Sequence, residues 1–249
     1  MIVDTDPQAS ATVALGYRDT DELKNTIAVL MVQQVGDENT KYDDFILKHC
    51  ENIDLIPANI ELSGMETTLL NVMSRETVLK NCFAELKQGY DYTIIDCMPS
   101  LSIIPVNALA AADSVIVPVQ PQYLSLKGMD QLLSTVAKVK KKINPDLSIE
   151  GILLTMTDMR TNLAREIKSL IYEKYDGKIP IFRSEIPLAV KAAEATAAGK
   201  SVFAYDPSGK VAAAYAELAK EMEELAKEVN GRGERIKYRD ADERVRCAF

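Results

Sequence analysis

Short, continuous apolar segments constrain the fold of this chain more than any other feature. Residues 90–100 read YDYTIIDCMPS, residues 112–121 read ADSVIVPVQP, and residues 148–158 read SIEGILLTMTD. Each contains an apolar run without polar alternation, which is typical of a strand covered on both faces of a sheet. Shorter runs at 53–58 and 177–182 predict two further strands.

Helical patterns separate these strands. Apolar residues recur at spacings of three and four within 78–86, 129–139, 163–171 and 211–229. Strands that alternate with helices predict an α/β fold, a mostly parallel sheet with helices on both faces. We interpret residues 1–229 as one domain. Residues 230–249 are densely charged and have no clean period, so we expect a mobile tail there.

Composition excludes several classes of protein. The net charge of -8 argues against a wholly basic nucleic-acid binder, although a local basic patch remains compatible with it. The four cysteines form no C-x-x-C pair, which favours reduced thiols over a disulfide framework or a zinc site. The single histidine, His49, has no second histidine to complete a metal site. Because no leader and no long uninterrupted apolar run is present, we expect neither secretion nor a membrane span.

Three aspartates follow predicted strands. Asp4 directly follows Ile2-Val3, Asp6 comes two residues later, and Asp96 ends the strand within 90–100. Carboxylates at the carboxyl ends of neighbouring parallel strands would repel one another, and a divalent metal would relieve this repulsion. The alternative for Asp96 is a plain strand-terminating aspartate in the turn that contains Pro99.

Four stretches, in order, resemble the ParA/Soj family of chromosome and plasmid partition ATPases. The resemblance runs from about residue 2 to about residue 229. The four stretches start with the sequences VDTDPQASATVALG, YDYTIIDCMPS, GILLTMTDMRTNLAREI and IPLAVKAAEATAAGKSVFAYDPSGKV. It implies a P-loop ATPase of the ParA/MinD type with ATP and Mg²⁺ as cofactors. It also implies a homodimer formed on ATP binding, nonspecific DNA binding, and stimulation by a ParB/Spo0J-like protein. The expected location is cytoplasmic and nucleoid-associated, without a membrane.

The resemblance assigns roles to the three acids. Asp6 would be the catalytic residue that orients the attacking water. Asp4 and Asp96 would support the magnesium shell, with Asp96 matching the Walker-B aspartate.

It also implies a nucleotide-base site and a DNA-binding face. Residues 155–158 and Pro187 fall where the family packs adenine, with Asp158 as a polar contact. Lys191 and Lys210 fall on the family's DNA-binding face, and the alternative for both is an ordinary solvated surface. The basic run at 138–142 is better explained as the polar side of its helix.

One part of the family pattern is missing. The phosphate loop, K-G-G-x-G-K followed by Ser or Thr, does not occur in the sequence. Residues 197–201, AAGKS, come nearest, but Glu194 stands where the first glycine of that pattern belongs. We therefore expect that Met1 is an internal methionine, a late start or the edge of a truncated gene, and that roughly 30 residues of strand, loop and helix are missing. We also expect weak ATP binding, an unpaired internal sheet edge and poor folding.

Three alternatives remain open. A MinD-like cell-division ATPase would need an amphipathic C-terminal helix, but charges surround the tail on all sides. An iron–sulfur reductase would need further cysteines between Cys97 and Cys247. An inactive paralogue would act only by protein interaction, through an intact ATPase or the ParB-like partner.

Overall fold

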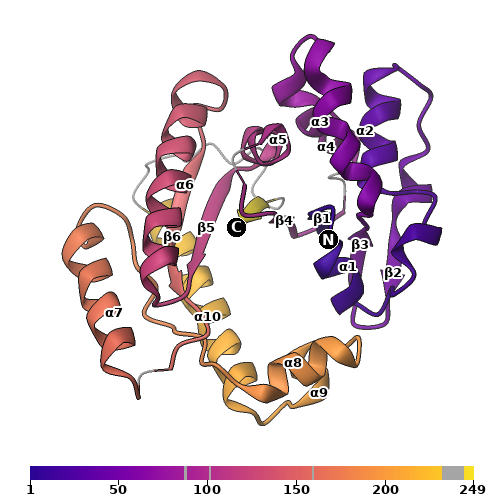
Figure 1. Cartoon of the computed structure of the whole chain (residues 1–249). Coiled ribbons are helices and arrows are strands. Elements are labelled where there is room, and N and C mark those ends of the chain that lie inside the picture. The colour runs from indigo at the N-terminus through magenta and orange to yellow at the C-terminus, as the bar shows by residue number, and fades with distance from the viewer. Residues whose placement is uncertain (87–88, 101, 159, 232–243) are drawn as a thin grey trace.

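The core of the computed structural model is one seven-stranded sheet with the order β2-β3-β1-β4-β7-β5-β6 (Figure 1). The structure describes residues 1–86, 89–100, 102–158, 160–231 and 244–249. Neighbouring strands run parallel, except that β2 and β3 are antiparallel. The strands are β1 (Ile2–Thr5), β2 (Leu47–His49), β3 (Ile53–Ile56), β4 (Tyr92–Cys97), β5 (Ser114–Val119), β6 (Ser148–Leu154) and β7 (Arg244–Ala248).

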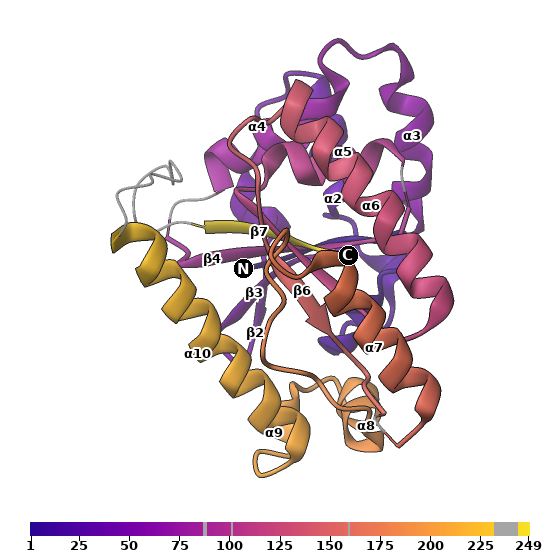
Figure 2. The same ribbon diagram turned by 90° about the vertical axis from the view of Figure 1, so that its left-hand side faces the viewer.

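Helices cover both faces of this sheet (Figure 2). They are α1 (Ser10–Ala14), α2 (Ile27–Val35), α3 (Met65–Thr68), α4 (Val78–Leu86), α5 (Ile103–Ala111), α6 (Tyr123–Lys142), α7 (Asn162–Tyr175), α8 (Val190–Ala197), α9 (Val202–Tyr205) and α10 (Lys210–Gly231). The larger apolar cluster joins the sheet to α2, α4, α5, α6 and α7. A smaller cluster on the other face joins β6 to α10. The predicted α/β class with a mostly parallel sheet is therefore confirmed.

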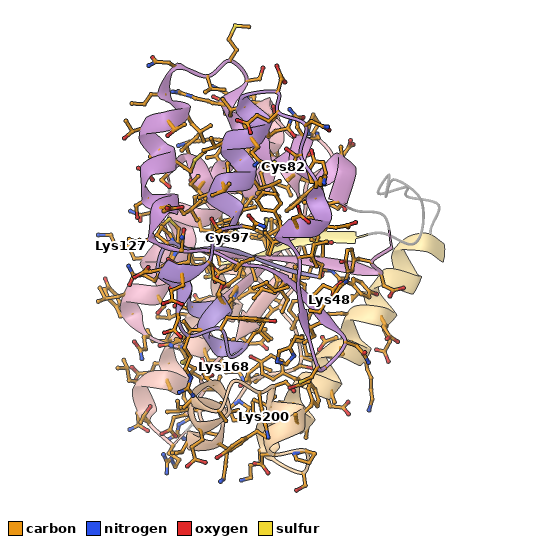
Figure 3. The ribbon with its side chains drawn as sticks, turned by 90° about the vertical axis from the view of Figure 1, so that its right-hand side faces the viewer. Lys48, Cys82, Cys97, Lys127, Lys168 and Lys200 are labelled. Carbon is orange, nitrogen blue, oxygen red and sulfur yellow. The ribbon has the colours of Figure 1, made fainter. Side chains whose placement is uncertain are left out.

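Most of the elements that the sequence patterns predicted are present in the structure. β3, β4, β5 and β6 lie within the predicted strand segments, and α4, α6, α7 and α10 contain the predicted helical patterns. Figure 3 shows Cys97 at the level of the strands and Cys82 on the side of α4, and both thiols are buried. The segment 177–182 is different, because it forms only an isolated bridge between Ile152 and Ile181.

The centre of the sheet departs from the sequence-based expectation. Instead of an unpaired internal edge, β7 lies between β4 and β5 and pairs in parallel with both. This placement corrects the interpretation of 230–249 as a mobile tail: 230–231 end α10, and 244–248 form a central strand. The remaining part of that segment, 232–243, lies outside the described residues. The division into 1–229 and 230–249 otherwise stays a prediction.

No helix within the described residues combines the length and the apolar character that crossing a bilayer requires.

Candidate acid site at the carboxyl edge of the sheet

The three predicted acids lie together at the carboxyl edge of the sheet. Asp4 and Asp96 are direct partners in the register of β1 and β4. Asp6 follows β1 by one residue, and its backbone N–H donates to Asp4 Oδ1 over 3.0 Å. Thr5, between the two acids, donates its hydroxyl to the backbone oxygen of Asp96 over 2.7 Å. The sequence-based expectation that the acids converge agrees with this geometry.

Asp4 is completely buried and is held by α1. Its Oδ2 atom accepts hydrogen bonds from the backbone N–H and the hydroxyl of Thr12, at 2.8 and 2.7 Å. The same hydroxyl oxygen accepts from the backbone N–H of Ala58 over 3.1 Å. Both carboxylate oxygens of Asp4 are therefore engaged within the protein. Sequence reasoning missed Thr12, because nothing in the local pattern of residues indicates that its hydroxyl bonds to Asp4.

Burial and mutual repulsion shift the pKa values of these acids. Burial raises the pKa of Asp4, and the hydrogen bonds from Thr12 and Asp6 oppose that change. Burial, followed by the charges of Asp4 and Asp6, raises the pKa of Asp96 from 3.8 to about 6. Above pH 6 the site therefore concentrates negative charge in a partly buried place, which is an environment that favours a cation.

A metal ion at this site stays a prediction. Among the described residues, no group of three or more His, Cys, Asp or Glu side chains has an arrangement that could hold a metal by protein ligands alone. Asp96 keeps partial exposure, whereas Asp4 is fully enclosed. The charge and donor chemistry thus fit a hard cation such as Mg²⁺ that keeps much of its water shell, with Asp96 as the more accessible carboxylate.

The predicted adenine-contact residues lie on adjoining segments past the end of β6. Thr157 bridges to Pro187, and its N–H donates to Ile186 O over 3.0 Å. The carboxylate of Asp158 is held by Arg160 through Nε at 2.8 Å and a terminal guanidinium nitrogen at 2.6 Å. This pairing, by hydrogen bond and charge, lowers the pKa of Asp158 to about 2. Asp158 and Pro187 are thus close in space, and their contact with a base stays a prediction.

The two predicted DNA-contact lysines lie on separate helices that both pack against α9. Lys191 is in the first turn of α8, where it pairs with Glu194 over 2.9 Å and lies 5.5 Å from the centre of the Tyr205 ring. Lys210 is the first residue of α10. The side chain of Lys191 is 59% exposed, so its ion pair with Glu194 leaves it accessible to a polyanion.

The structure agrees with the rejection of residues 197–201 as a phosphate loop. Gly199 lies against Gly16, and a Cβ atom at Gly199 would be only 2.7 Å from Gly16 Cα. Ser201 caps the short helix α9, and its N–H donates to Glu51 over 3.1 Å. A segment packed this way presents no open row of backbone N–H groups. Within the part of the chain that the structure describes, the residues therefore fit the cation-facing part of a nucleotide site but not its triphosphate-binding part.

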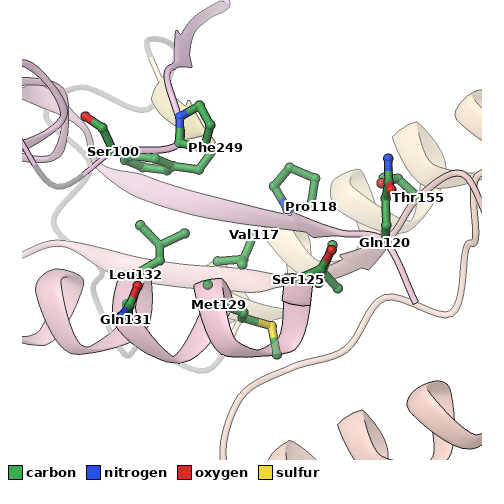
Figure 4. A pocket seen from close by; sticks show the side chains of 13 residues that line it. Ser100, Val117, Pro118, Gln120, Ser125, Met129, Gln131, Leu132, Thr155 and Phe249 are labelled. Carbon is green, nitrogen blue, oxygen red and sulfur yellow. The ribbon is translucent and has the colours of Figure 1, made fainter. Parts of the chain in front are cut away.

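A pocket of about 520 Å³ lies between β5 and α6 (Figure 4). Ser125, Met129 and Leu132 of α6 face β5, while Ser100 and Phe249 lie at one end. None of the described residues that line it has a charged side chain. The pocket therefore provides no cation to neutralise phosphate groups.

Known proteins resemble most of this chain. A family model described as an AAA domain matches residues 1–149. The sporulation initiation inhibitor protein Soj of Bacillus subtilis is 42% identical over 222 residues, which cover 89% of this chain and 85% of Soj. The chromosome partitioning protein ParA of Myxococcus xanthus is 37% identical over 224 residues, covering 89% and 76% of the two chains. Cobyrinic acid a,c-diamide synthase of Mycobacterium smegmatis, solved with bound ADP and magnesium, has a TM-score of 0.75 and 32% identity, covering 94% of this chain and 83% of its own.

Proposed function

The chain belongs to the ParA/Soj family of partition ATPases, and from this premise we propose that it acts in the segregation of chromosomal or plasmid DNA. In this proposal, Mg²⁺-ATP promotes a homodimer that binds DNA nonspecifically on the nucleoid, in the cytoplasm, and a ParB-like protein is the partner. The observation that carries the proposal is the convergence of Asp4, Asp6 and Asp96 at one edge of the sheet.

Each acid has a distinct part in this proposal. Asp96 is partly exposed and has a raised pKa, so it would interact with the water shell of magnesium. Asp4 would act behind it, because its hydrogen bonds with Thr12 fix its orientation. Asp6 is only partly buried and would orient a water molecule at the same edge. The magnesium nucleotide of a family ATPase supplies the phosphoanhydride bond that is hydrolysed.

A second candidate function follows from the poor fit to a triphosphate. The sequence contains no G-x4-G-K-S/T pattern, and residues 197–201 are packed in a way that excludes a phosphate cradle. In this alternative, the chain takes part in partition by binding an intact homologue, the ParB-like protein or DNA, and hydrolyses no nucleotide.

Phosphate release from Mg²⁺-ATP separates the two candidates. It would be measured with the purified chain alone, with nonspecific duplex DNA, and with a ParB-like protein. Hydrolysis that Asp96→Asn abolishes supports the ATPase, whereas Asp146→Asn, an exposed aspartate after α6, serves as the matched control. Absence of hydrolysis together with retained DNA or partner binding supports the second candidate. If neither hydrolysis nor any binding is found, both candidates are refuted.

The DNA-binding part has its own test. Lys191→Glu and Lys210→Glu should each weaken binding to duplex DNA and lessen its dependence on salt, because each removes a cation that would contact phosphate. Lys220→Glu is the control, since Lys220 is 67% exposed on the same helix as Lys210 but far along it. Equal effects of all three substitutions would show that only net charge matters.

A further inference from the structure

Both edges of β7 pair with neighbouring strands of the sheet. On one side, Tyr92 to Asp96 of β4 pair with Arg244 to Ala248, and on the other, Ser114 to Ile116 of β5 pair with Arg246 to Ala248. The N–H of Val245 donates to Asp113 Oδ2 over 2.8 Å, and its carbonyl oxygen accepts from the N–H of Asp113 over 2.8 Å. Asp113, just before β5, therefore fixes the register of the incoming strand.

The side chains of β7 alternate between two different environments. Val245 and Cys247 are buried in the larger apolar cluster. Arg246 points to the opposite face, where Nε donates to Glu150 Oε1 over 2.8 Å and the guanidinium lies 4.6 Å from the centre of the Tyr92 ring. The side chains of Arg246 and Glu150 are only 7% and 15% exposed. This buried ion pair therefore favours an arginine at the third position of the strand.

The contacts that recognise β7 come from elements distant in sequence. β7 packs against β4, β5 and α5, and its ionic partner is on β6. The same contacts would form if an identical strand came from another polypeptide, because none of these groups depends on the covalent link to α10. Exchange of an identical element is a low-cost route to association.

We propose that the gap between β4 and β5 is a strand-binding site that accepts residues 244–248 from a second copy of the chain as well as from its own. The ligand is an extended segment that enters parallel to β4, with two apolar residues on one face and an arginine between them on the other. A second copy is the partner because its strand satisfies the ladder, the apolar face and Glu150 together. The chain's own strand has an effective concentration on the order of millimolar, so it fills the site first in dilute protein.

Charge reversal separates binding within one chain from binding between chains. Two full-length variants, Glu150→Arg and Arg246→Glu, each place like charges between their own strand and their own site. When they are mixed, each site meets a strand of opposite charge from the other protein. The double variant, with both substitutions in one chain, restores the pair within each molecule and is the matched control.

Native mass spectrometry of the two variants without nucleotide, alone and mixed, is the test. We expect heterodimers in the mixture at a level at least tenfold above homodimers of either variant alone, and no gain for the double variant. A labelled peptide with the sequence of residues 244–249 should also bind Arg246→Glu at least tenfold more tightly than wild type. Arg246→Gln, a milder substitution, replaces Arg246→Glu if the latter does not fold. A mixture that stays monomeric, together with no peptide binding by a folded Arg246 variant, would overturn the proposal. Failure of both Arg246 variants to fold, without rescue by the peptide, would overturn it as well.

Discussion

Replacing Asp96 by asparagine should make the protein more stable at neutral pH, although it removes a proposed site residue. The raised pKa means that the folded protein holds the ionised carboxylate at a cost. The contribution of the protonated Asp96 carboxyl group to the free energy of unfolding is fully present below about pH 3.8. It is lost as the pH rises through about 6. At roughly 1.4 kcal/mol per pKa unit, the shift from 3.8 to about 6 corresponds to a cost of up to about 3 kcal/mol at pH 7. Partial exposure of Asp96 lowers the expected value to about 2 kcal/mol.

Urea unfolding of wild type and Asp96→Asn at intervals from pH 4 to pH 8 measures this effect. The difference in the free energy of unfolding reports the carboxylate of Asp96 together with its repulsion with Asp4 and Asp6, because every acid outside this group keeps its surroundings in both proteins. It should be within about 0.6 kcal/mol of its acid limit at pH 4 and should grow to about 2 kcal/mol by pH 7. Asp146→Asn should leave the curve unchanged, since Asp146 is exposed. A difference that does not vary with pH, or a less stable Asp96→Asn protein at pH 7, would refute the argument that burial and repulsion raise this pKa.

Three further predictions concern Thr12, Gly199 and the thiols. Thr12→Val should lower the free energy of unfolding by about 2 to 3 kcal/mol, because a buried oxygen of Asp4 loses one of its two donors and the N–H of Ala58 loses its acceptor. Thr12→Ser keeps the hydroxyl, and urea unfolding compares the two variants. Gly199→Ala should lower the melting temperature more than Gly177→Ala, because both glycines have positive φ but only at Gly199 would the new methyl group meet backbone atoms. Equal decreases in the melting temperature would contradict this. A thiol reagent should modify only Cys50 quickly in the native protein, since the other three cysteines are buried, and all four cysteines in denaturant. Fast modification of more than one cysteine in the native protein would contradict the structure.

Local sequence patterns were sufficient for elements whose burial is uniform. β5 is predictable because its residues are apolar on both faces, and α6 because its apolar residues recur at helical spacing. The convergence of Asp4 and Asp96 was predictable from the rule that parallel strands present their carboxyl ends at one edge. For the segment 177–182, the apolar pattern predicted a strand, and this prediction was wrong. Its apolar residues pack beside β6, where Gly151 leaves room for Phe182, and it pairs through a single bridge.

β7 could not be predicted from its own residues. Arg246 alternates with Val245 and Cys247, and an arginine at that position usually indicates a face exposed to water. Its burial depends on Glu150, which is distant in sequence and lies on β6. The contact of Thr12 with Asp4 was hidden for a related reason, since a threonine in a short helix carries no local sign of its hydrogen-bond partner. The burial of Arg246 thus depends on a partner distant in sequence, and the contact of Thr12 with Asp4 joins residues eight positions apart; neither contact is visible in a local pattern.

The position of β7 has a consequence for the order in which the protein is made. β1 can pair with β3 and with β4, and β5 can pair with β6, as soon as each pair of strands has left the ribosome. The strand that joins these two groups is the last of the seven in chain order. During synthesis, each group therefore keeps an unpaired edge until β7 has been made. The contacts that join the two groups also span a very long stretch of sequence. Closure of such distant contacts is slow, so this nascent chain should depend on chaperones more than a sheet completed from neighbouring strands.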